Sequence, residues 1–427
     1  MLHSSTLQHD SYAALRVHDF RWLVIGHAAL TFAREAQIVV IGWQVFAITR
    51  DPLALGLIGL AEAVPLLGLA LFAGHFADRM PRRPIAIAGT VAMLGAATVL
   101  LWLTLQESFI SGRRVWPVYL VIILGGIGRA FVRPAVSALG AEVMPRELYA
   151  NAVAWRTTGW HLAAIAGPAA GGMVYGFAGP TAAYASVIVL MLLSLAALSA
   201  VRHRVRPVAP EEEPIVESIK AGLRFVLRDQ VLLAAMTLDL FSVLFGGAVA
   251  LLPVFASLLG AGPQGLGLLR SAPAIGSITT GLLLAHRPPL MRAGRTLLTA
   301  VGVFGIAMIA FAVSRNFYLS FLLLLAGGAA DGVSVVIRGV LLQSRAPQHM
   351  LGRVSSVNQI FISASNEIGA FESGVAARLL GVVPSVLFGG VMTVLVVVLT
   401  AWRAPGLRSL REIATPLGDS DDTLHPS

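Results

Sequence analysis

Long apolar runs alternate with short polar segments along almost the whole chain. A helix needs roughly 20 consecutive, mainly apolar residues to cross the hydrocarbon core of a bilayer. Twelve runs reach that length, at 20–48, 54–77, 84–105, 115–140, 149–177, 180–201, 229–259, 264–285, 294–314, 316–343, 351–380 and 382–403. The pattern predicts an all-α membrane protein with twelve transmembrane helices.

One long polar segment interrupts these runs and divides them into six and six. It covers residues 202–228 and contains several prolines and three consecutive glutamates, a composition typical of a linker. Its last part, residues 217–227, predicts an amphipathic helix. The predicted organisation is a cytoplasmic N-terminal segment (1–19), an N-terminal six-helix bundle (20–201), a cytoplasmic linker (202–228), a C-terminal six-helix bundle (229–403) and a cytoplasmic tail (404–427). Segment 1–19 lacks the features of a signal peptide, so we expect no cleavage there.

Glycines and prolines recur at a constant offset of 202 residues. The offset relates Gly125 to Gly327, Gly126 to Gly328, Pro145 to Pro347, Gly167 to Gly369 and Gly172 to Gly374. It predicts that the fourth and fifth helices are repeated as the tenth and eleventh in the same orientation. Such a parallel repeat of six-helix halves is an established architecture of membrane transporters.

The composition agrees with a chain surrounded by lipid. Only 12% of the 427 residues are charged, against about 25% in soluble domains. The chain has no cysteine, which excludes disulfides and thiolate metal sites. A net charge of +9 would favour nucleic acid as the partner of a soluble protein. Here basic cytoplasmic loops explain the charge, so we expect no nucleic-acid partner.

The distribution of basic residues predicts the orientation. If both termini are cytoplasmic, twenty basic residues lie in inside segments and five lie outside. The five outside residues are Arg50, Arg113, Arg114, Arg315 and Arg378. The bias follows the positive-inside rule. We therefore expect a multi-pass protein of the bacterial inner (plasma) membrane with both termini cytoplasmic.

The loop after the second run has the pattern G-x-x-x-D-R-x-x-R-R. Its defining residues are Gly74, Asp78, Arg79, Arg82 and Arg83. The glycine permits close helix approach, the aspartate suits a helix N-terminus or an arginine, and the arginines hold the loop in the cytoplasm. The pattern resembles the loop signature of the major facilitator superfamily, although a simple positive-inside loop is an alternative. The resemblance implies a latch between the two halves that stabilises the outward-facing state, and Glu142 is placed to join it.

The fifth run carries a second pattern, G-P-x-x-G-G, formed by Gly167, Pro168, Gly171 and Gly172. Small residues permit tight contact between membrane helices, and neighbouring helices can cover the backbone that the proline frees. The pattern resembles the helix-five motif of exporters in the same superfamily. Generic helix packing is the alternative explanation.

Across nearly the whole chain the resemblance is to the enterobactin-exporter-like (transmembrane secretion effector) branch of this superfamily. It is carried by residues 238–241, 250–255 and 350–354. The branch implies a major facilitator fold of two pseudo-symmetric six-helix bundles and efflux of siderophores or other small amphipathic molecules. The second-half counterpart of the loop signature is degenerate, because Arg287, Arg292 and Arg295 occur there without an acid.

Thirteen charged residues fall inside the predicted helices, where each costs at least ~2.5–3.5 kcal/mol on insertion scales. They are Glu35, Glu62, Glu142, Asp239, Asp331, Glu367 and Glu372, with Arg34, Arg129, Arg133, Arg156, Arg270 and Arg338. Structural ion pairs are one explanation for most of them. Proton coupling instead needs a carboxylate that alternates between dry and wet surroundings, and Glu35 is the first candidate, followed by Asp239 and Glu62. Because Arg34 and Glu35 are adjacent and point about 100° apart, we expect no pairing between them.

The remaining candidates concern a substrate cavity. Its predicted lining is Arg34, Arg129, Arg133, Asp331, Glu367, Trp43, Trp155 and Phe241. Arg129 and Asp331 occupy equivalent places in the repeat with opposite charge, which raises the hypothesis of an ion pair between them. For the aromatic residues, packing or an interfacial position is an equally good interpretation.

These observations predict a secondary active exporter of small amphipathic molecules, siderophore-like or drug-like, that works by alternating access and proton antiport. The expected partners are a small-molecule substrate, protons and membrane lipids, and the expected state is a monomer. No nucleotide-binding loop, catalytic triad or metal-ligand cluster occurs in the sequence, so we expect no enzyme, cofactor or metal site. The alternatives are a lipid or metabolite carrier of the same fold, which includes importers, and a receptor or regulator that does not transport.

Overall fold

The computed structural model describes residues 10–106, 114–202, 215–286 and 292–410, without the side chains of 70, 71 and 73–78. The linker residues 203–214 and tail residues 411–427 of the expected organisation lie outside this part. All regular structure in the described residues is helical, which confirms the predicted all-α class. The chain divides into two compact units, Met1–Thr49 with Val64–Glu211, and Arg50–Ala63 with Glu212–Ser427.

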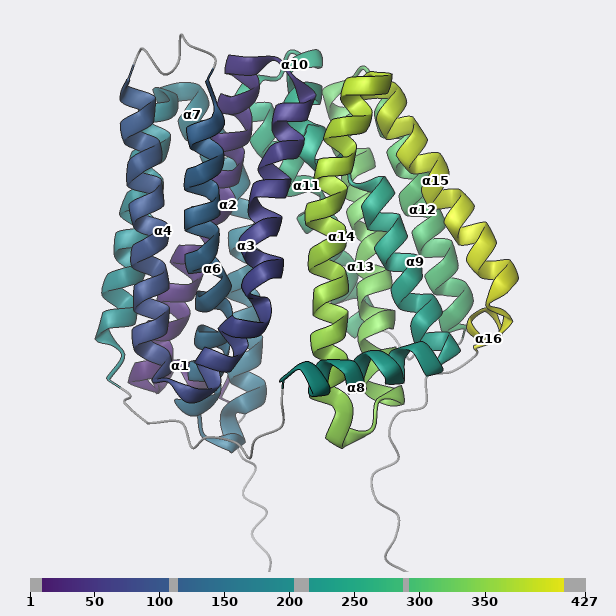
Figure 1. Cartoon of the computed structure of the whole chain (residues 1–427), viewed down its shortest axis with the longest axis horizontal. Coiled ribbons are helices and arrows are strands. Elements are labelled where there is room, and N and C mark those ends of the chain that lie inside the picture. The colour runs from purple at the N-terminus through teal and green to yellow at the C-terminus, as the bar shows by residue number, and fades with distance from the viewer. Residues whose placement is uncertain (1–9, 107–113, 203–214, 287–291, 411–427) are drawn as a thin grey trace, which may run out of the picture. The chain divides into compact units, whose positions relative to one another are not determined.

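The helices of the first unit follow the predicted runs closely. They are α1 (Ala13–Arg16), α2 (His18–Thr49), most of α3 (Pro52–Arg79), α4 (Arg82–Leu105), α6 (Trp116–Glu142), the 3-10 turn η1 (Arg146–Leu148) and α7 (Tyr149–Ala200). Long, nearly parallel rods make up this unit in Figure 1. The element α7 contains both predicted runs, 149–177 and 180–201, and Gly179 turns the chain sharply between them, with φ 82° and ψ 175°.

The second unit contains the linker helix and the second set of spans. Its helices are α8 (Ile215–Arg228), α9 (Gln230–Gly246), η2 (Ala248–Leu251), α10 (Leu252–Leu258), α11 (Gly262–Ala285), α12 (Ala293–Val313), α13 (Phe317–Arg345), η3 (Gln348–Met350), α14 (Leu351–Leu380), α15 (Val382–Arg403) and α16 (Pro405–Arg408). The first turns of α3, residues 52–63, also belong to this unit, whereas the sequence assigned them to the N-terminal bundle.

Ten described stretches are long and apolar enough to cross a membrane. One of them, Arg146–Ala200, is 55 residues long and holds two spans, because Gly179 interrupts it. Helix α14 has 30 residues and the length of a span, but its two arginines and two glutamates make it more polar than the rest. With α7 divided at Gly179 and α14 added, the described helices match the twelve predicted spans.

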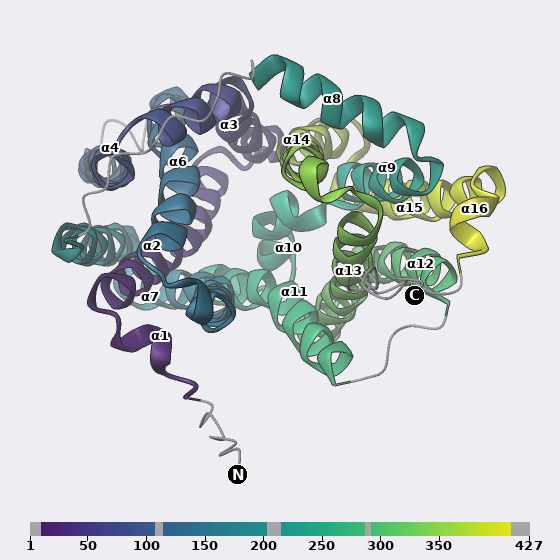
Figure 2. The ribbon, with the colours of Figure 1, turned by 90° about the horizontal axis from the view of Figure 1, so that it is seen from below.

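The linker helix α8 packs on the second unit instead of lying free. Figure 1 shows it crossing the ends of α9, α13 and α14, and Figure 2 shows the same helix from below, beside α14 and α9. Val226 is fully buried in a cluster with Leu232, Leu342 and Val354. The absent side chain of Gly222 brings α8 to 2.8 Å from the Arg353 carbonyl oxygen, measured from an ideal Cβ position. The apolar face of α8 therefore packs against the helices of the second unit, which explains the amphipathic pattern of its sequence.

The predicted repeat appears in the backbone as well as in the sequence. Pro145 and Pro347, 202 residues apart, both precede a short 3-10 turn, with φ −59° and ψ 144° against φ −57° and ψ 147°. Gly179 and Gly381 are also 202 apart, and both make the next interhelical turn with positive φ, 82° and 94°. The repeated glycines face equivalent neighbours, because Gly126 on α6 contacts Pro65 on α3.

In the second half, Gly328 on α13 faces the backbone of Pro273 on α11, whereas Gly126 faces the ring of Pro65. Side chains at these glycines would overlap the facing helix, so the glycines set the closest approach of each helix pair. The predicted pseudo-symmetry of two six-helix halves is confirmed.

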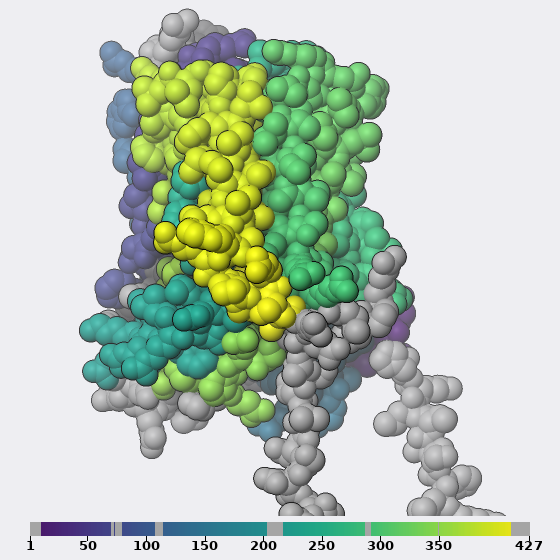
Figure 3. Space-filling model, turned by 90° about the vertical axis from the view of Figure 1, so that its right-hand side faces the viewer, coloured from purple at the N-terminus to yellow at the C-terminus, as the bar shows by residue number. Residues whose placement is uncertain are grey.

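The outer face of the second unit is apolar. Figure 3 shows α15 beside α12 with α8 beneath them. The exposed side chains of α12 and α15 include Ile306, Leu395, Val398 and Leu399. An apolar surface of this extent on a soluble protein would promote association. Exposed apolar side chains of this kind are typical of membrane helices that face lipid.

Candidate transport site

Glu35 lies near the middle of α2 and forms an ion pair with the residue before it. Arg34 Nη1 is 3.3 Å from Glu35 Oε1, and both side chains are partly buried. The expectation that these neighbours cannot pair is wrong. Their Cα–Cβ bonds do diverge around the helix, but the long arginine side chain reaches back across that angle. Glu35 therefore sits beside a compensating charge.

The helix-five motif packs directly against α2 at this point. Gly167, Pro168, Gly171 and Gly172 are all buried in α7. An ideal Cβ at Gly167 would lie 2.8 Å from Glu35 Cβ and 3.0 Å from the Phe32 carbonyl oxygen. Because glycine has no Cβ, the two helices approach almost to backbone contact. The motif thus determines how deeply the Glu35 segment of α2 is set into the first unit.

Several arginines of the first unit lie within electrostatic reach of one another. Arg133 on α6 feels the charges of Arg129, one turn before it, and of Arg34 on α2. His27 on α2 feels Arg133 and Arg156, and its Nδ1 is a buried atom without a hydrogen-bond partner among the described residues. The structure therefore brings together three of the predicted cavity residues, Arg34, Arg129 and Arg133, and adds Arg156 to the group.

A second charged cluster lies in the other unit. Asp239 on α9 forms an ion pair with Arg338 on α13 at 2.5 Å between Oδ2 and Nη1, and each side chain is only 9% exposed. Arg338 Nε also donates a hydrogen bond to Ser334 Oγ at 3.2 Å. Asp331, a predicted cavity residue, is half-buried and feels the charge of Arg338.

Sequence reasoning missed the role of Arg338. The signal was present, because Asp331 and Arg338 are seven residues apart and therefore share one face of a helix.

The remaining carboxylate candidates lie where α3 meets α14 within the second unit. The missing side chain of Gly59 brings α3 within 3.1 Å of the Glu367 carbonyl oxygen, measured from an ideal Cβ position. Glu62 follows Gly59 by less than one helical turn, and both Glu62 and Glu367 are half-buried. Asp51 and Arg378 form an ion pair at 2.5 Å near the ends of the same two helices.

The aromatic candidates have different surroundings. Phe241 on α9 stacks on Phe245, with ring centroids 6.0 Å apart, and remains 36% exposed. Trp155 is engaged by the N-terminal segment, because its Nε1 donates to the Ser11 carbonyl oxygen at 2.9 Å and its ring lies 5.6 Å from that of Tyr12. Trp43 is half-buried in α2. Of the three aromatic residues, Phe241 has the most exposed side chain.

The arginines of the loop signature bind helix ends within the first unit. Arg82 forms an ion pair with Glu142, the last residue of α6, at 2.5 Å. Arg83 donates to the carbonyl oxygens of Leu198 and Ser199 at the end of α7, at 3.4 and 2.7 Å. These carbonyls have no intrahelical donor, so an arginine there satisfies both their hydrogen bonding and the helix dipole.

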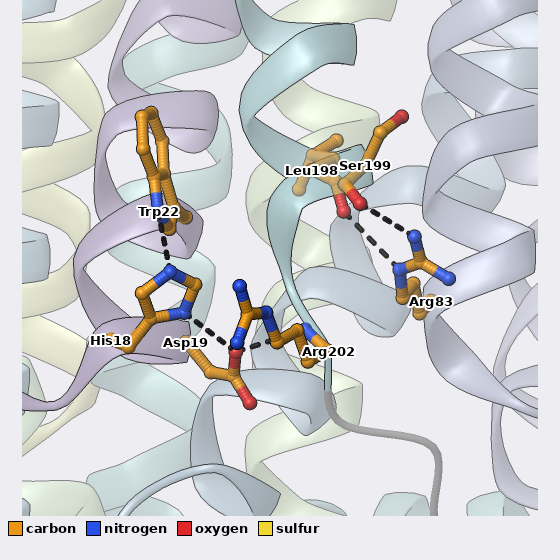
Figure 4. A network of polar contacts seen from close by, with 7 residues as sticks. All are labelled: His18, Asp19, Trp22, Arg83, Leu198, Ser199 and Arg202. Atoms are coloured by element: carbon orange, nitrogen blue, oxygen red, sulfur yellow. Dashed lines mark hydrogen bonds and ion pairs between the residues drawn. The ribbon is translucent and has the colours of Figure 1, made fainter.

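Figure 4 shows these Arg83 contacts beside a second contact with the end of α7. There the Arg202 amide donates to Asp19 Oδ1 of α2 at 2.9 Å. Gly74 and the side chain of Asp78 lie outside the described residues, and Arg79 is exposed. Glu142 therefore joins the loop signature through Arg82.

Asp229 stabilises the start of α9. Its Oδ1 accepts hydrogen bonds from the Val231 and Leu232 amides at 3.0 and 2.9 Å, and Arg345 Nη1 lies 2.9 Å from Oδ2. Burial alone would raise the pKa of Asp229. The hydrogen bonds from Leu232 and Arg345 and the arginine charge outweigh burial and hold the pKa below its usual 3.8. The described residues contain no group of three histidine, aspartate or glutamate side chains that could hold a metal ion.

A family model described as transmembrane secretion effector matches residues 9–415. The match spans both charged clusters, the loop signature and the helix-five motif. The chain belongs to this family of the major facilitator superfamily. The family and its relatives are membrane transporters and not enzymes, and the resemblance inferred from the sequence is confirmed.

Curated relatives of this chain match over most of their length. The chain is 27% identical over 376 residues to the multidrug efflux pump Tap of Mycolicibacterium fortuitum, which covers 84% of this chain and 90% of Tap. It is 26% identical over 423 residues to the enterobactin exporter EntS of Escherichia coli O1:K1, covering 92% and 95%.

A solved structure of a bacterial homologue of the human lysosomal transporter Spinster aligns with a TM-score of 0.72 and 15% identity, covering 94% of this chain and 99% of that one. At that identity the alignment establishes the fold alone. It agrees with the twelve-helix major facilitator architecture.

Proposed function

We propose that this protein exports small amphipathic molecules, siderophore-like or drug-like, across the bacterial inner membrane in exchange for protons. The observation that carries the proposal is the contact between the helix-five motif and the Glu35 segment of α2. A motif that resembles the exporter pattern is thus packed against a carboxylate at membrane depth. The names of the relatives, a multidrug efflux pump and an enterobactin exporter, favour the same direction of transport.

Proton coupling is proposed because carboxylates are retained inside the membrane where they are costly. Glu35, Asp239 and Glu62 are the candidates for the coupling path. The paired Arg34 gives Glu35 a partner that it could exchange during the cycle. A carboxylate that gains and loses such a partner as the cavity opens would bind its proton more tightly in one state than in the other.

In the first unit the arginines are the proposed candidates for substrate contacts, and in the second unit Phe241 on α9 is the candidate. Arginine donates several hydrogen bonds in a fixed geometry and suits anionic or polyhydroxylated compounds. An aromatic side chain that is partly exposed adds an apolar surface for an amphipathic molecule. The protein is proposed to act as a monomer with both termini in the cytoplasm.

The test is efflux of ethidium, a fluorescent amphipathic cation, from energised cells that lack their own pumps. Cells expressing the wild type, Glu35→Gln or Glu217→Gln are compared with and without a protonophore. Glu217 lies on the linker helix α8 outside the spans, so it provides a matched Glu-to-Gln control. Membrane abundance of each variant is measured in parallel.

We expect the wild type and Glu217→Gln to export the dye, and the protonophore to abolish this export. We expect Glu35→Gln to be present in the membrane but inactive. Export that survives collapse of the proton gradient would refute proton coupling. Normal export by Glu35→Gln would transfer the coupling role to Asp239 or Glu62.

Energised uptake of the dye would favour an importing carrier. No flux, combined with altered signalling in a strain that lacks the protein, would favour a regulator.

A further inference from the structure

Two carboxylates lie within electrostatic reach of one guanidinium in the second unit. Asp239 lies in the middle of α9, whereas Asp331 and Arg338 lie on α13, seven residues apart. Seven residues make almost two full turns, so Asp331 and Arg338 share one face of α13. The three charged groups therefore lie within electrostatic reach of one another inside the spans.

The two acids differ in their contacts. Asp239 Oδ2 lies 2.5 Å from Arg338 Nη1, and Ser334 Oγ accepts the Nε hydrogen of the same arginine. Asp331 makes neither an ion pair nor a hydrogen bond within the part of the chain that the structure describes. It interacts with Arg338 through charge alone and is repelled by Asp239. Asp331 is thus the carboxylate of the cluster that has no hydrogen-bond donor on its oxygens among the described residues and is able to bind a proton.

The surrounding helices do not change this balance. The charged or titratable groups on the elements packed against α13 are Asp239 on α9, Arg270 on α11, Arg295 on α12, and Arg353, Glu367, Glu372 and Arg378 on α14, while α13 itself adds Tyr318, Asp331, Arg338 and Arg345. Of these, Arg338 and Asp239 act on Asp331. The cluster holds two acids and one base, so it carries one excess negative charge when both acids are ionised.

The packing of α13 keeps Asp331 in place. Gly328 and Gly332 lie on either side of it and bring α13 into close contact with α11 at Pro273 and Ser277. Small residues on both sides fix the helix position. The contact between α13 and α11 therefore fixes the backbone position of Asp331.

We propose that Asp331 binds the transported proton and that the Asp239–Arg338 ion pair stays ionic when it does so. This inference rests on the proposed proton coupling and names a residue outside the coupling candidates given above. The step is protonation of one carboxylate to a carboxylic acid, which removes the excess charge. Loss of that proton leaves two carboxylates, Asp239 and Asp331, near the single guanidinium of Arg338. The repulsion between the two carboxylates then couples the proton to rearrangement of α9 against α13.

The charge balance dictates how variants behave. Asp331→Asn removes the proton site and leaves one acid with one base, so this variant folds. Asp239→Asn also leaves one acid with one base, so Asp331 becomes the partner of Arg338 and stays ionised. The double variant Asp239→Asn/Asp331→Asn leaves Arg338 without a carboxylate in the cluster and is less stable than either single variant.

The experiment is infrared difference spectroscopy of the purified protein in lipid, titrated from alkaline to acidic pH. A protonated carboxylic acid has a C=O stretch separate from all carboxylate bands. The samples are the wild type, Asp331→Asn, Asp331→Glu, Asp239→Asn and Glu217→Gln. Thermal unfolding of each sample shows that it is folded.

At neutral pH, where the solvent-exposed carboxylates are ionised, we expect a carboxylic-acid band in the wild type and in Glu217→Gln, a shifted band in Asp331→Glu, and no such band in Asp331→Asn and Asp239→Asn. A wild-type band that remains in folded Asp331→Asn would overturn the proposal, and so would one that remains in Asp239→Asn.

This measurement needs no substrate, so it stands apart from the ethidium assay. Loss of the band in Asp331→Asn, together with efflux that ignores the protonophore, would support the proton site while refuting the proposed antiport.

Discussion

The contact between α7 and α2 makes a quantitative prediction for Gly171→Ala. An ideal Cβ at Gly171 would lie 2.7 Å from the Ala36 carbonyl oxygen and 2.8 Å from Ala36 Cα. Both atoms are backbone, so no side chain can rotate away. Ordinary contact begins at 3.4 Å, and the helices would have to separate by about 0.7 Å at this point, in an interior packed like a crystal. Overpacking of this kind costs about 1–3 kcal/mol.

Gly281→Ala on α11 is the control that separates this overpacking cost from the effect of helix propensity. No atom lies within 4 Å of the Cβ position at Gly281. Replacing glycine by alanine in a helix is worth up to about 1 kcal/mol in propensity at either position. That gain cancels when the two variants are compared, so Gly171→Ala should be less stable than Gly281→Ala by about 1–3 kcal/mol.

The assay is reversible unfolding of both variants in mixed detergent micelles, followed by tryptophan fluorescence. Dye efflux is measured on the same variants in cells. We expect Gly171→Ala to lose export as well as stability, because the Glu35 segment of α2 is displaced. Equal stability of the two alanine variants would show that α2 and α7 do not pack through these glycines, and the argument for the helix-five contact would fail.

Three further predictions concern other parts of the scaffold. Gly179→Ala should cost about 1–3 kcal/mol although no atom lies within 4 Å of its Cβ position, because its φ of 82° is strained for alanine; an unfolding curve like that of Gly281→Ala would contradict this. Asp229→Asn keeps the oxygen that caps α9 but loses the charge facing Arg345, so it should lower the unfolding temperature at neutral pH. Because folding lowers the pKa of Asp229, the stabilisation by its charge is fully present above pH 3.8 and is lost as the pH falls through the lower pKa of the folded state. A difference in unfolding temperature between the wild type and Asp229→Asn that persists in acid would contradict this prediction. Arg378→Gln should change stability by less than about 1 kcal/mol, since its pair with Asp51 is exposed, and a larger loss measured by unfolding would point to a role in closure.

The helices were predictable because lipid imposes a simple rule. Each span must be long and apolar, so runs such as 84–105 and 382–403 nearly coincide with α4 and α15. The repeat was predictable for a related reason, since glycines that set helix contacts cannot be replaced by larger residues. Even the turn at Gly179 could be placed, because the apolar pattern breaks beside Pro180.

The charge partners were not predictable in the same way. The sequence shows which faces of one helix carry charge, but it does not show which helices are neighbours. Asp239 and Arg338 are 99 residues apart, and only the packing of α9 beside α13 brings them together. For Arg34 and Glu35 the error was different, because the angle between adjacent side chains was treated as fixed although arginine has a long flexible stem.

The two halves keep the same scaffold but carry different charges on it. Gly167 and Gly369 each press the fifth helix of a half against its first helix, one at Phe32 and Glu35, the other at Val243 and Leu244. The carboxylate at the first contact has an apolar counterpart at the second, and the acids within the spans of the second half lie at other positions, on α9, α13 and α14. Small residues therefore preserve the structural symmetry of the two halves. The charged residues within the spans do not follow that symmetry. The first half is rich in arginine, whereas the second half holds the excess of carboxylates.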